Sequence, residues 1–115
     1  MTGIRISPFA RVLRQMVRES GEWSWVEAFR RCSYLPAQVM SFTSDMAGKG
    51  HLSVGADADL VVIDPETITD TATYLNPTST SVGIEHLFVG GEAVVAHGSL
   101  VTNAFPGKPV RAQIR

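Results

Sequence analysis

The chain is poor in several features that define whole classes of protein. It has a single cysteine among 115 residues, so no internal disulfide can form and a reducing compartment is indicated. No apolar run approaches the length of a membrane span, and the N-terminus shows no charged-then-apolar signal pattern. The net charge of −1 creates no strong field that would attract nucleic acid or an anionic membrane. We therefore expect a cytoplasmic protein that binds neither nucleic acid nor membrane.

Residue patterns that carry catalysis are equally scarce. The histidines His51, His86 and His97 each stand alone, and none of the usual metal-ligand spacings occurs. Asp57 and Asp59 invite a metal or acid–base interpretation, but an aspartate in a Gly-Ala-Asp turn typically bonds nearby backbone N–H groups. The glycine-rich segments precede strands and not helices, so they form no phosphate-binding loop. We therefore predict no catalytic, cofactor-binding or metal-binding residue in this chain.

The first part of the sequence predicts an amphipathic helix. Pro8 suits the first helical position, Ser7 can cap it, and Gly21 can stop it in a left-handed conformation. Apolar residues recur at helical spacing and form the set Phe9, Val12, Leu13, Met16 and Val17. The opposite face carries three arginines, Arg11, Arg14 and Arg18, which we expect to be exposed.

A capping-box pattern formed by Ser24 and Glu27 predicts a second helix through about residue 33. Its inward-facing set is expected to be Val26, Phe29 and Cys32. Because proline lacks an N–H group, Pro36 should end this helix and open a short third one through about Phe42.

Three side chains near the second helix have a structural and a functional interpretation. Trp23 and Trp25 are expected to pack at the helix junction and not to stack on a ligand. Cys32 is expected to be a small buried apolar group and not a nucleophile.

From Gly48 onward, glycines separate short runs rich in valine, isoleucine and leucine, which is typical of strands and turns. The continuous apolar run 60–63 predicts a central strand that is buried on both faces. Residues 84–89 and 92–96 flank Gly90-Gly91 as a hairpin, and His97-Gly98 makes another turn before a short strand at 99–101. The threonine-rich stretch 66–81 should be a long connection, and the tail after Asn103 should be irregular.

Helices followed by strands indicate an α+β fold. We divide the chain into a helical segment, residues 1–47, and a small antiparallel or mixed sheet, residues 48–115. Three to five short strands cannot close a barrel, so the sheet keeps edges with unpaired N–H and C=O groups. Such edges need cover from a partner or from further chain.

Several segments resemble one enzyme family. Residues 49–65 resemble the amidohydrolase signature KGxLxxGxDADLVVxDP, and residues 35–40 resemble the LPAxxLGL helix that precedes it. Residues 9–13 resemble the Phe-Pro-Arg-Val-Leu element of the N-acyl-D-amino acid deacylases, and residues 76–91 resemble their NPTxxxxGIxxVxVNG ending. Residues 106–108 resemble the PGR tail. The chain departs from these patterns at Ala10, at Met40-Ser41-Phe42 and at Gly90-Gly91, in place of Pro, Leu-Gly-Leu and Asn-Gly.

The resemblance implies the C-terminal portion of a zinc-dependent amidohydrolase. In that family the metal lies at the mouth of a (β/α)₈ barrel, held by an HxH pair, a bridging or cysteine ligand and two later histidines, and a catalytic aspartate follows the last strand. The metal lowers the pKa of a bound water, and the catalytic aspartate takes the proton of that water. By the resemblance this chain starts after that aspartate. Residues 1–47 then correspond to the last barrel helices and residues 48–115 to part of a small composite β-sandwich. No family catalytic residue is carried over, so the chain alone is expected to be catalytically incomplete.

Two other functions remain open at this point. The chain could be a stand-alone, non-enzymatic α+β module that forms homo-oligomers through its exposed β edges. It could also complement a separately encoded barrel to form a complete hydrolase. Light scattering tests the first alternative, and an assay for hydrolysis of an N-acetyl-D-amino acid tests whether the chain is active alone.

Overall fold

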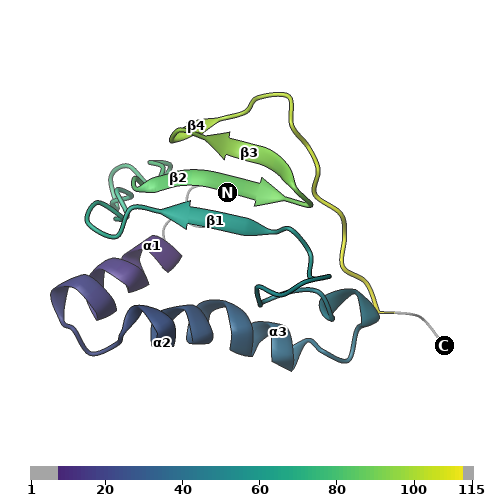
Figure 1. Ribbon diagram of the computed structural model, residues 1–115. Coiled ribbons are helices and arrows are strands. Elements are labelled where there is room, and N and C mark those ends of the chain that lie inside the picture. The colour runs from purple at the N-terminus through teal and green to yellow at the C-terminus, as the bar shows by residue number, and fades with distance from the viewer. Residues whose placement is uncertain (1–7, 113–115) are drawn as a thin grey trace.

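The computed structural model describes residues 8–112, which form helices first and an antiparallel sheet second (Figure 1). The α-helix α1, Pro8–Val12, continues directly into the π-helical residues Leu13–Glu19. Gly21 then adopts a φ of 67°, as predicted for the residue that stops this helix. The predicted cap Ser7 lies outside the described residues. Each helix within residues 8–112 is too short or too polar to span a lipid bilayer.

The second helix combines α2, Trp25–Phe29, with the π-helical residues Arg30–Tyr34 and α3, Leu35–Val39. Ser24 caps it as predicted, because its hydroxyl accepts a hydrogen bond from the Glu27 N–H at 3.2 Å. The second half of the predicted capping box is replaced by an ion pair, since the Glu27 carboxylate lies 2.5 Å from Arg31 Nε. A short 3₁₀ helix, Ser44–Met46, follows.

The prediction for Pro36 is partly correct, because α3 begins with Pro36 in its first turn as expected, but the chain stays helical through this residue to Val39 without a break. The reason lies in the π-helical turn just before it, where the Leu35 N–H bonds to the Arg30 carbonyl five residues back. A proline removes one donor and crowds the preceding turn of an α-helix. A wider turn at that position relieves the crowding, so the helix axis continues.

Four antiparallel strands form one sheet in the order β1-β2-β3-β4, which confirms the α+β prediction. The strands are β1 (Leu60–Ile63), β2 (Ile84–Val89), β3 (Glu92–Ala96) and β4 (Ser99–Leu100). Both predicted two-residue turns are present. Gly90 and Gly91 have φ values of 57° and 83°, and His97 and Gly98 have values of 51° and 75°. Positive φ at both central positions gives the turn twist that matches the flanking strands.

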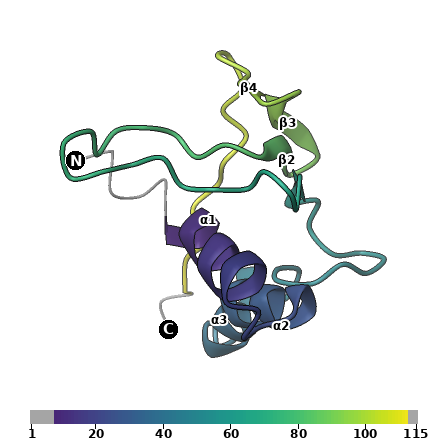
Figure 2. The ribbon, with the colours of Figure 1, turned by 90° about the vertical axis from the view of Figure 1, so that its left-hand side faces the viewer.

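The long connection between β1 and β2, residues 64–83, forms an irregular ribbon that extends well away from the strands it joins (Figure 2). Its base is closed by a hydrogen bond from the Asp64 N–H to the Gly83 carbonyl at 2.8 Å and by a bridge between Thr69 and Val82. Gly83 has a φ of 88°, and a Cβ there would lie 2.4 Å from the Ile68 Cα. The base of the ribbon therefore requires glycine at this position.

The core lies where the two helices meet the base of the ribbon. Its buried members are Ala10, Leu13, Ala28 and Ile68, and Val17, Trp23, Trp25, Ile63 and Ile84 pack against them. The predicted packing of the two tryptophans at the helix junction is confirmed. The predicted inward sets are partly wrong, since Phe9 is 63% and Val26 77% exposed, and Phe29 is also exposed. The buried apolar residues of the two helices are Ala10, Leu13, Ala28 and Ala37, so small side chains fill most of the buried helical positions.

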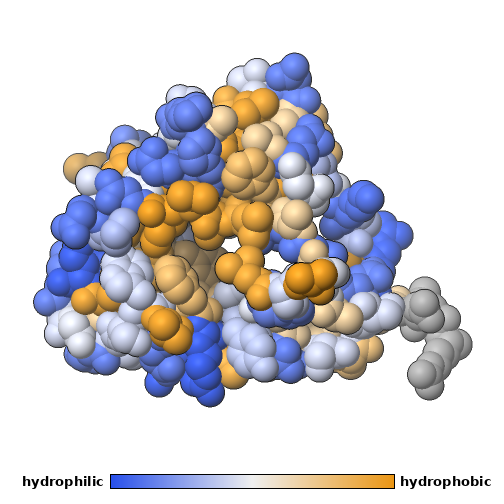
Figure 3. All heavy atoms as spheres, viewed as in Figure 1, coloured by the Kyte–Doolittle hydropathy of each residue, from blue (hydrophilic) through white to orange (hydrophobic). Residues whose placement is uncertain are grey.

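The prediction for the apolar run 60–63 is wrong in one respect. It forms β1, but β1 is an edge strand that pairs only with β2, and Leu60, Val61 and Val62 are 37%, 53% and 47% exposed. The helices lie beyond the free edge of β1 and do not cover its faces (Figures 1 and 2). Apolar side chains surround a hollow between the sheet and the helices (Figure 3). The described residues thus leave uncovered a strand whose composition is that of a buried one.

Candidate functional site

Lys49 lies between the two aspartates of the turn that precedes β1. Its Nζ is 2.6 Å from Asp59 Oδ2 and 2.9 Å from Asp57 Oδ2. The other oxygen of Asp59 accepts a hydrogen bond from the Gly90 N–H at 2.9 Å, across 31 residues of sequence. We expected nearby backbone partners for these carboxylates. The structure instead gives them a lysine, and gives Asp59 the distant hairpin turn.

The charges in this cluster stabilise one another. Lys49 lowers the pKa of Asp59 most, and the Gly90 N–H lowers it further. Asp59 and then Asp57 raise the pKa of Lys49. At neutral pH the lysine and Asp59 therefore remain ionised. An acid–base catalyst needs a group whose pKa is close to the working pH. The pKa values of Lys49 and Asp59 are shifted away from neutral pH, so this cluster is suited to holding the chain together.

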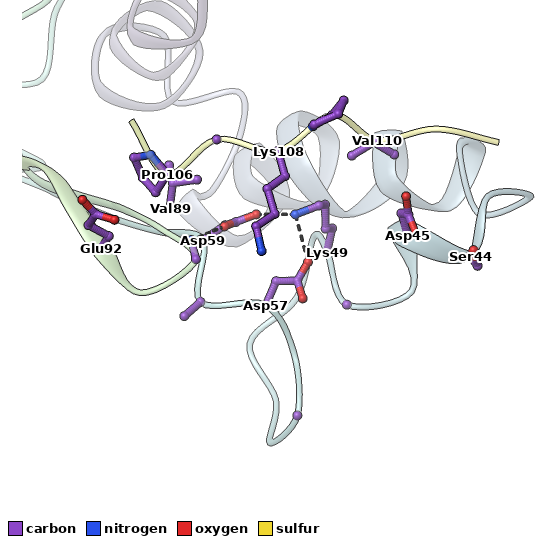
Figure 4. Close-up of a pocket in the computed structure, with 16 residues that line it drawn as sticks. Ser44, Asp45, Lys49, Asp57, Asp59, Val89, Glu92, Pro106, Lys108 and Val110 are labelled. Atoms are coloured by element: carbon purple, nitrogen blue, oxygen red, sulfur yellow. Dashed lines mark hydrogen bonds and ion pairs between the residues drawn. The ribbon is translucent and has the colours of Figure 1, made fainter. Parts of the chain in front are cut away.

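A separate pocket of about 1100 Å³ opens beside this cluster. It is lined by parts of the segments 44–49, 55–59, 89–92 and 106–110 (Figure 4). The Lys108 side chain points into it next to the Lys49–Asp59 pair. The tail that closes this side is held by a hydrogen bond from the Arg111 N–H to Asp45 Oδ2 at 3.4 Å. None of the lining residues is a histidine or cysteine, so the lining offers no histidine-activated nucleophile.

A second charged cluster fixes the ribbon to the first helix. Arg11 Nε is 2.7 Å from Asp70 Oδ2, and Arg14 Nη2 is 2.9 Å from Asp70 Oδ1. Arg18 Nη1 donates to the Ile68 carbonyl at 2.6 Å. Burial raises the pKa of Asp70, but the hydrogen bonds from Arg11 and Arg14 outweigh burial, and the pKa lies below its usual value. The cluster anchors the ribbon.

The prediction of an exposed arginine face is therefore only partly correct. Arg11 and Arg18 are exposed, but the Arg14 side chain is 23% exposed and the Asp70 side chain only 4%. The sequence contains one signal for this pairing. Asp70 is the one charged residue between Glu66 and Glu85, and three arginines share one helix face.

The structure brings two of the three histidines together. The rings of His86 and His97 are 4.8 Å apart between centroids, and the His97 N–H approaches His86 Nδ1 at 3.4 Å. Hairpin pairing causes this approach, which the sequence separation does not show. His51 is engaged locally, with Nδ1 2.8 Å from Ser53 Oγ and Nε2 3.1 Å from the Ala47 carbonyl.

The expectation for Cys32 is met in part. The side chain is half-buried in the second helix, and burial raises the pKa of its thiol. A raised pKa lowers the thiolate fraction at neutral pH, and the thiolate is the reactive form. The environment of Cys32 is thus that of a packing residue.

A catalytic zinc ion takes three protein ligands and leaves one position open. Among residues 8–112, no group of three or more His, Cys, Asp or Glu side chains is placed to hold a metal ion. The His86–His97 pair provides two imidazoles at most, and one ring nitrogen already faces a backbone N–H. These donors do not fit a catalytic zinc site.

Comparison with known proteins now defines the class. The model of the amidohydrolase family matches residues 2–94, and the chain belongs to this family. The N-acyl-D-glutamate deacylase of Alcaligenes xylosoxydans xylosoxydans is 44% identical over 86 residues, which cover 75% of this chain and 17% of that enzyme. The D-aminoacylase of the same organism is 38% identical with the same coverage. The resemblance to the N-acyl-D-amino acid deacylase branch is thereby confirmed.

Solved structures agree. The N-acyl-D-glutamate deacylase from Bordetella bronchiseptica, in complex with zinc and a phosphonate inhibitor, has a TM-score of 0.80 and 40% identity, covering 92% of this chain and 21% of that one. A D-aminoacylase with a binuclear metal center has a TM-score of 0.74 and 34% identity, covering 83% of this chain and 19% of that one. The chain thus spans about a fifth of the length of the relatives it matches.

Proposed function

We propose that this chain is the C-terminal structural portion of an amidohydrolase that deacylates N-acyl-D-amino acids. One observation carries the proposal: 92% of the chain superimposes on part of an N-acyl-D-glutamate deacylase at 40% identity. The described residues contribute packing and charged anchors, of which the Lys49–Asp57–Asp59 cluster is one. The alternative that they form a reaction centre of their own has no cluster of ligands or activated nucleophile to support it within residues 8–112.

The names of the relatives bear on the substrate. Three of them act on N-acyl-D-glutamate, on N-acyl-D-aspartate, or, as a D-aminoacylase, on acylated D-amino acids. We propose the same substrate class and zinc as the metal of the complete enzyme, with its ligands outside residues 8–112. We also propose that residues 1–47 belong to the end of its barrel, that residues 48–115 belong to its small composite β-sandwich domain, and that the enzyme works in the cytoplasm.

A chimera tests this function directly. The matched stretch of the Alcaligenes N-acyl-D-glutamate deacylase is replaced by this chain, and hydrolysis of N-acetyl-D-glutamate is compared with that of the unmodified relative. We expect activity within about tenfold, because changes that keep packing leave the transition-state contacts intact. The isolated chain with zinc should show no turnover. A folded but inactive chimera, or turnover by the isolated chain, would contradict the proposal.

The free edge of β1 favours one competing function. A stand-alone module could use this edge to form homo-oligomers, since unpaired backbone groups of an edge strand can pair with another copy. Light scattering of the isolated chain as a function of concentration distinguishes a self-associating module from the structural portion of an enzyme. A defined dimer together with an inactive chimera would support the module.

A further inference from the structure

The tip of the ribbon presents two large apolar side chains to solvent. Tyr74 is 105% and Leu75 is 98% exposed. They occupy the two central positions of a tight turn, in which the N–H groups of Thr73 and Asn76 donate to each other's carbonyls at 3.1 and 3.2 Å. Such positions are usually taken by glycine, proline, asparagine, aspartate or serine. Two adjacent apolar side chains at the end of a projecting ribbon therefore indicate a surface that is covered in the functional protein.

Contacts along the ribbon fix the direction in which this tip points. Two arginines of the first helix hold Asp70, as described above. Beyond this anchor, the Thr71 hydroxyl donates to the Thr80 carbonyl at 2.7 Å and joins the two arms of the ribbon. At the tip itself, the Asn76 N–H also donates to Thr73 Oγ1 at 3.0 Å. The position of the tip is thus set relative to the first helix.

The ribbon runs against the direction of the first helix. Arg18, near the end of that helix, donates to the Ile68 carbonyl at 2.6 Å. Arg14 and Arg11, which lie successively closer to the start of the helix, pair with Asp70. Figure 2 shows the ribbon continuing past the start of α1. The tip, residues 73–76, therefore lies beyond the N-terminal end of this helix.

In the enzyme proposed above, this end of the helix lies at the catalytic face. Each helix of a (β/α)₈ barrel follows a strand, so its N-terminal end lies where the carboxyl ends of the strands meet, and active sites are built at that face. The inference rests on the proposed function, which places residues 1–47 at the end of such a barrel. The ribbon tip then projects toward the substrate site and away from the opposite face of the barrel.

The chemistry of the tip indicates which part of the substrate it meets. Residues 71–84 carry no charged side chain. An apolar, uncharged surface would desolvate the carboxylates of an N-acyl-D-amino acid without compensating their charge, whereas it gains free energy by covering the methylene groups of the acyl chain. We propose that Tyr74 and Leu75 form one wall of the acyl-binding part of the substrate site and thereby determine which acyl lengths the enzyme accepts.

Substitutions in the chimera described above test this assignment. The measured quantity is the ratio of kcat/KM for N-butyryl-D-glutamate to kcat/KM for N-acetyl-D-glutamate. Tyr74→Ser and Leu75→Ser should each lower this ratio about tenfold, mainly through the KM for the butyryl substrate, because an apolar pocket distinguishes one methylene to about this extent. Leu75→Met keeps the apolar volume and should keep the ratio. Leu100→Ser, at a leucine that is 67% exposed on β4, is the matched control and should also leave the ratio unchanged.

The outcomes distinguish the inference from the function on which it rests. A folded, active chimera whose ratio is unchanged by both serine variants overturns the assignment of the tip to the acyl group, and leaves the proposed function standing. Equal losses with both substrates, together with a lower midpoint of thermal unfolding, would show that the tip only packs against the barrel, and they overturn the assignment too. A chimera that is unfolded or inactive before any change at the tip overturns the proposed function, and the inference with it.

Discussion

The base of the ribbon and the free edge of β1 are built from similar apolar residues but differ in cover. At the base, Ile68 is 1% exposed, and Asp70 is held by two arginines. At the free edge, Val61 and Val62 are about half exposed, and their strand has a neighbour on one side only. Apolar character therefore shows that a segment is meant to be buried, and the fold shows whether these residues bury it themselves. The predictions below test this difference.

The largest effect is expected at Gly83. Gly83→Ala should lower the free energy of unfolding by at least about 4 kcal/mol, because it combines a strained positive φ with a clash against backbone that cannot move. Gly55→Ala is the matched control, since Gly55 has a φ of 87° and nothing within 4 Å of the added Cβ. It should cost only about 1 kcal/mol. Urea denaturation of both variants measures the difference, and equal losses would show that the ribbon base is not tightly packed.

A pair of truncations compares the two regions directly. Ile68→Ala should lower the free energy of unfolding by about 3 kcal/mol, because a fully buried side chain leaves a cavity. Val62→Ala in the isolated chain should lower it by less than about 1 kcal/mol, because the side chain is 47% exposed. Chemical denaturation of both variants measures the two losses of unfolding free energy. A loss at Val62 as large as that at Ile68 would mean that β1 is covered in the isolated chain.

Asp70→Asn weakens the charged anchor of the ribbon and should lower the free energy of unfolding by about 2 kcal/mol at pH 7, because the buried Asp70 loses the charge that pairs with Arg11 and Arg14. The pKa of Asp70 is lowered in the folded state, so its stabilising effect is present above the unfolded value of about 3.9 and is lost as pH falls through the folded value. The difference between wild type and variant should therefore shrink below about pH 4. Glu22→Gln, at an exposed carboxylate, is the control and should change the free energy of unfolding little at pH 7.

The smallest effect is expected at the motif lysine. Lys49→Met should lower the free energy of unfolding by under about 1 kcal/mol, because its partners Asp57 and Asp59 are partly exposed and solvent screens the pairs. Lys108→Met, at the neighbouring lysine that lines the same pocket, should have no measurable effect on the free energy of unfolding. A loss of several kcal/mol at Lys49 would instead show that solvent screens these ion pairs much less than their exposure implies.

The sequence predicted those elements that local chemistry determines. The Ser24 cap, the stop at Gly21 and both two-residue turns follow from preferences of single residues and their neighbours, and all are present.

The errors arose where distant segments meet. Asp59 bonds to Gly90 and Asp70 to Arg11 and Arg14, and these partners lie 31 to 59 residues apart. Pro36 continues a helix because of a wide turn that no local preference reveals. The status of β1 as an edge strand depends on which further segments are available, and a short apolar run contains no information about its neighbours.

The hydrogen bond between the Asp59 carboxylate and the Gly90 N–H has a consequence for strand alignment. It joins the residue just before β1 to the turn that follows β2, so it forms only when the two strands pair as they do here. A slip by one residue would move these groups apart by about 3.3 Å and turn every side chain of β1 to the opposite face. A single carboxylate thus discriminates the native alignment from its nearest competitors, in a sheet whose four-residue edge strand could otherwise pair in more than one way.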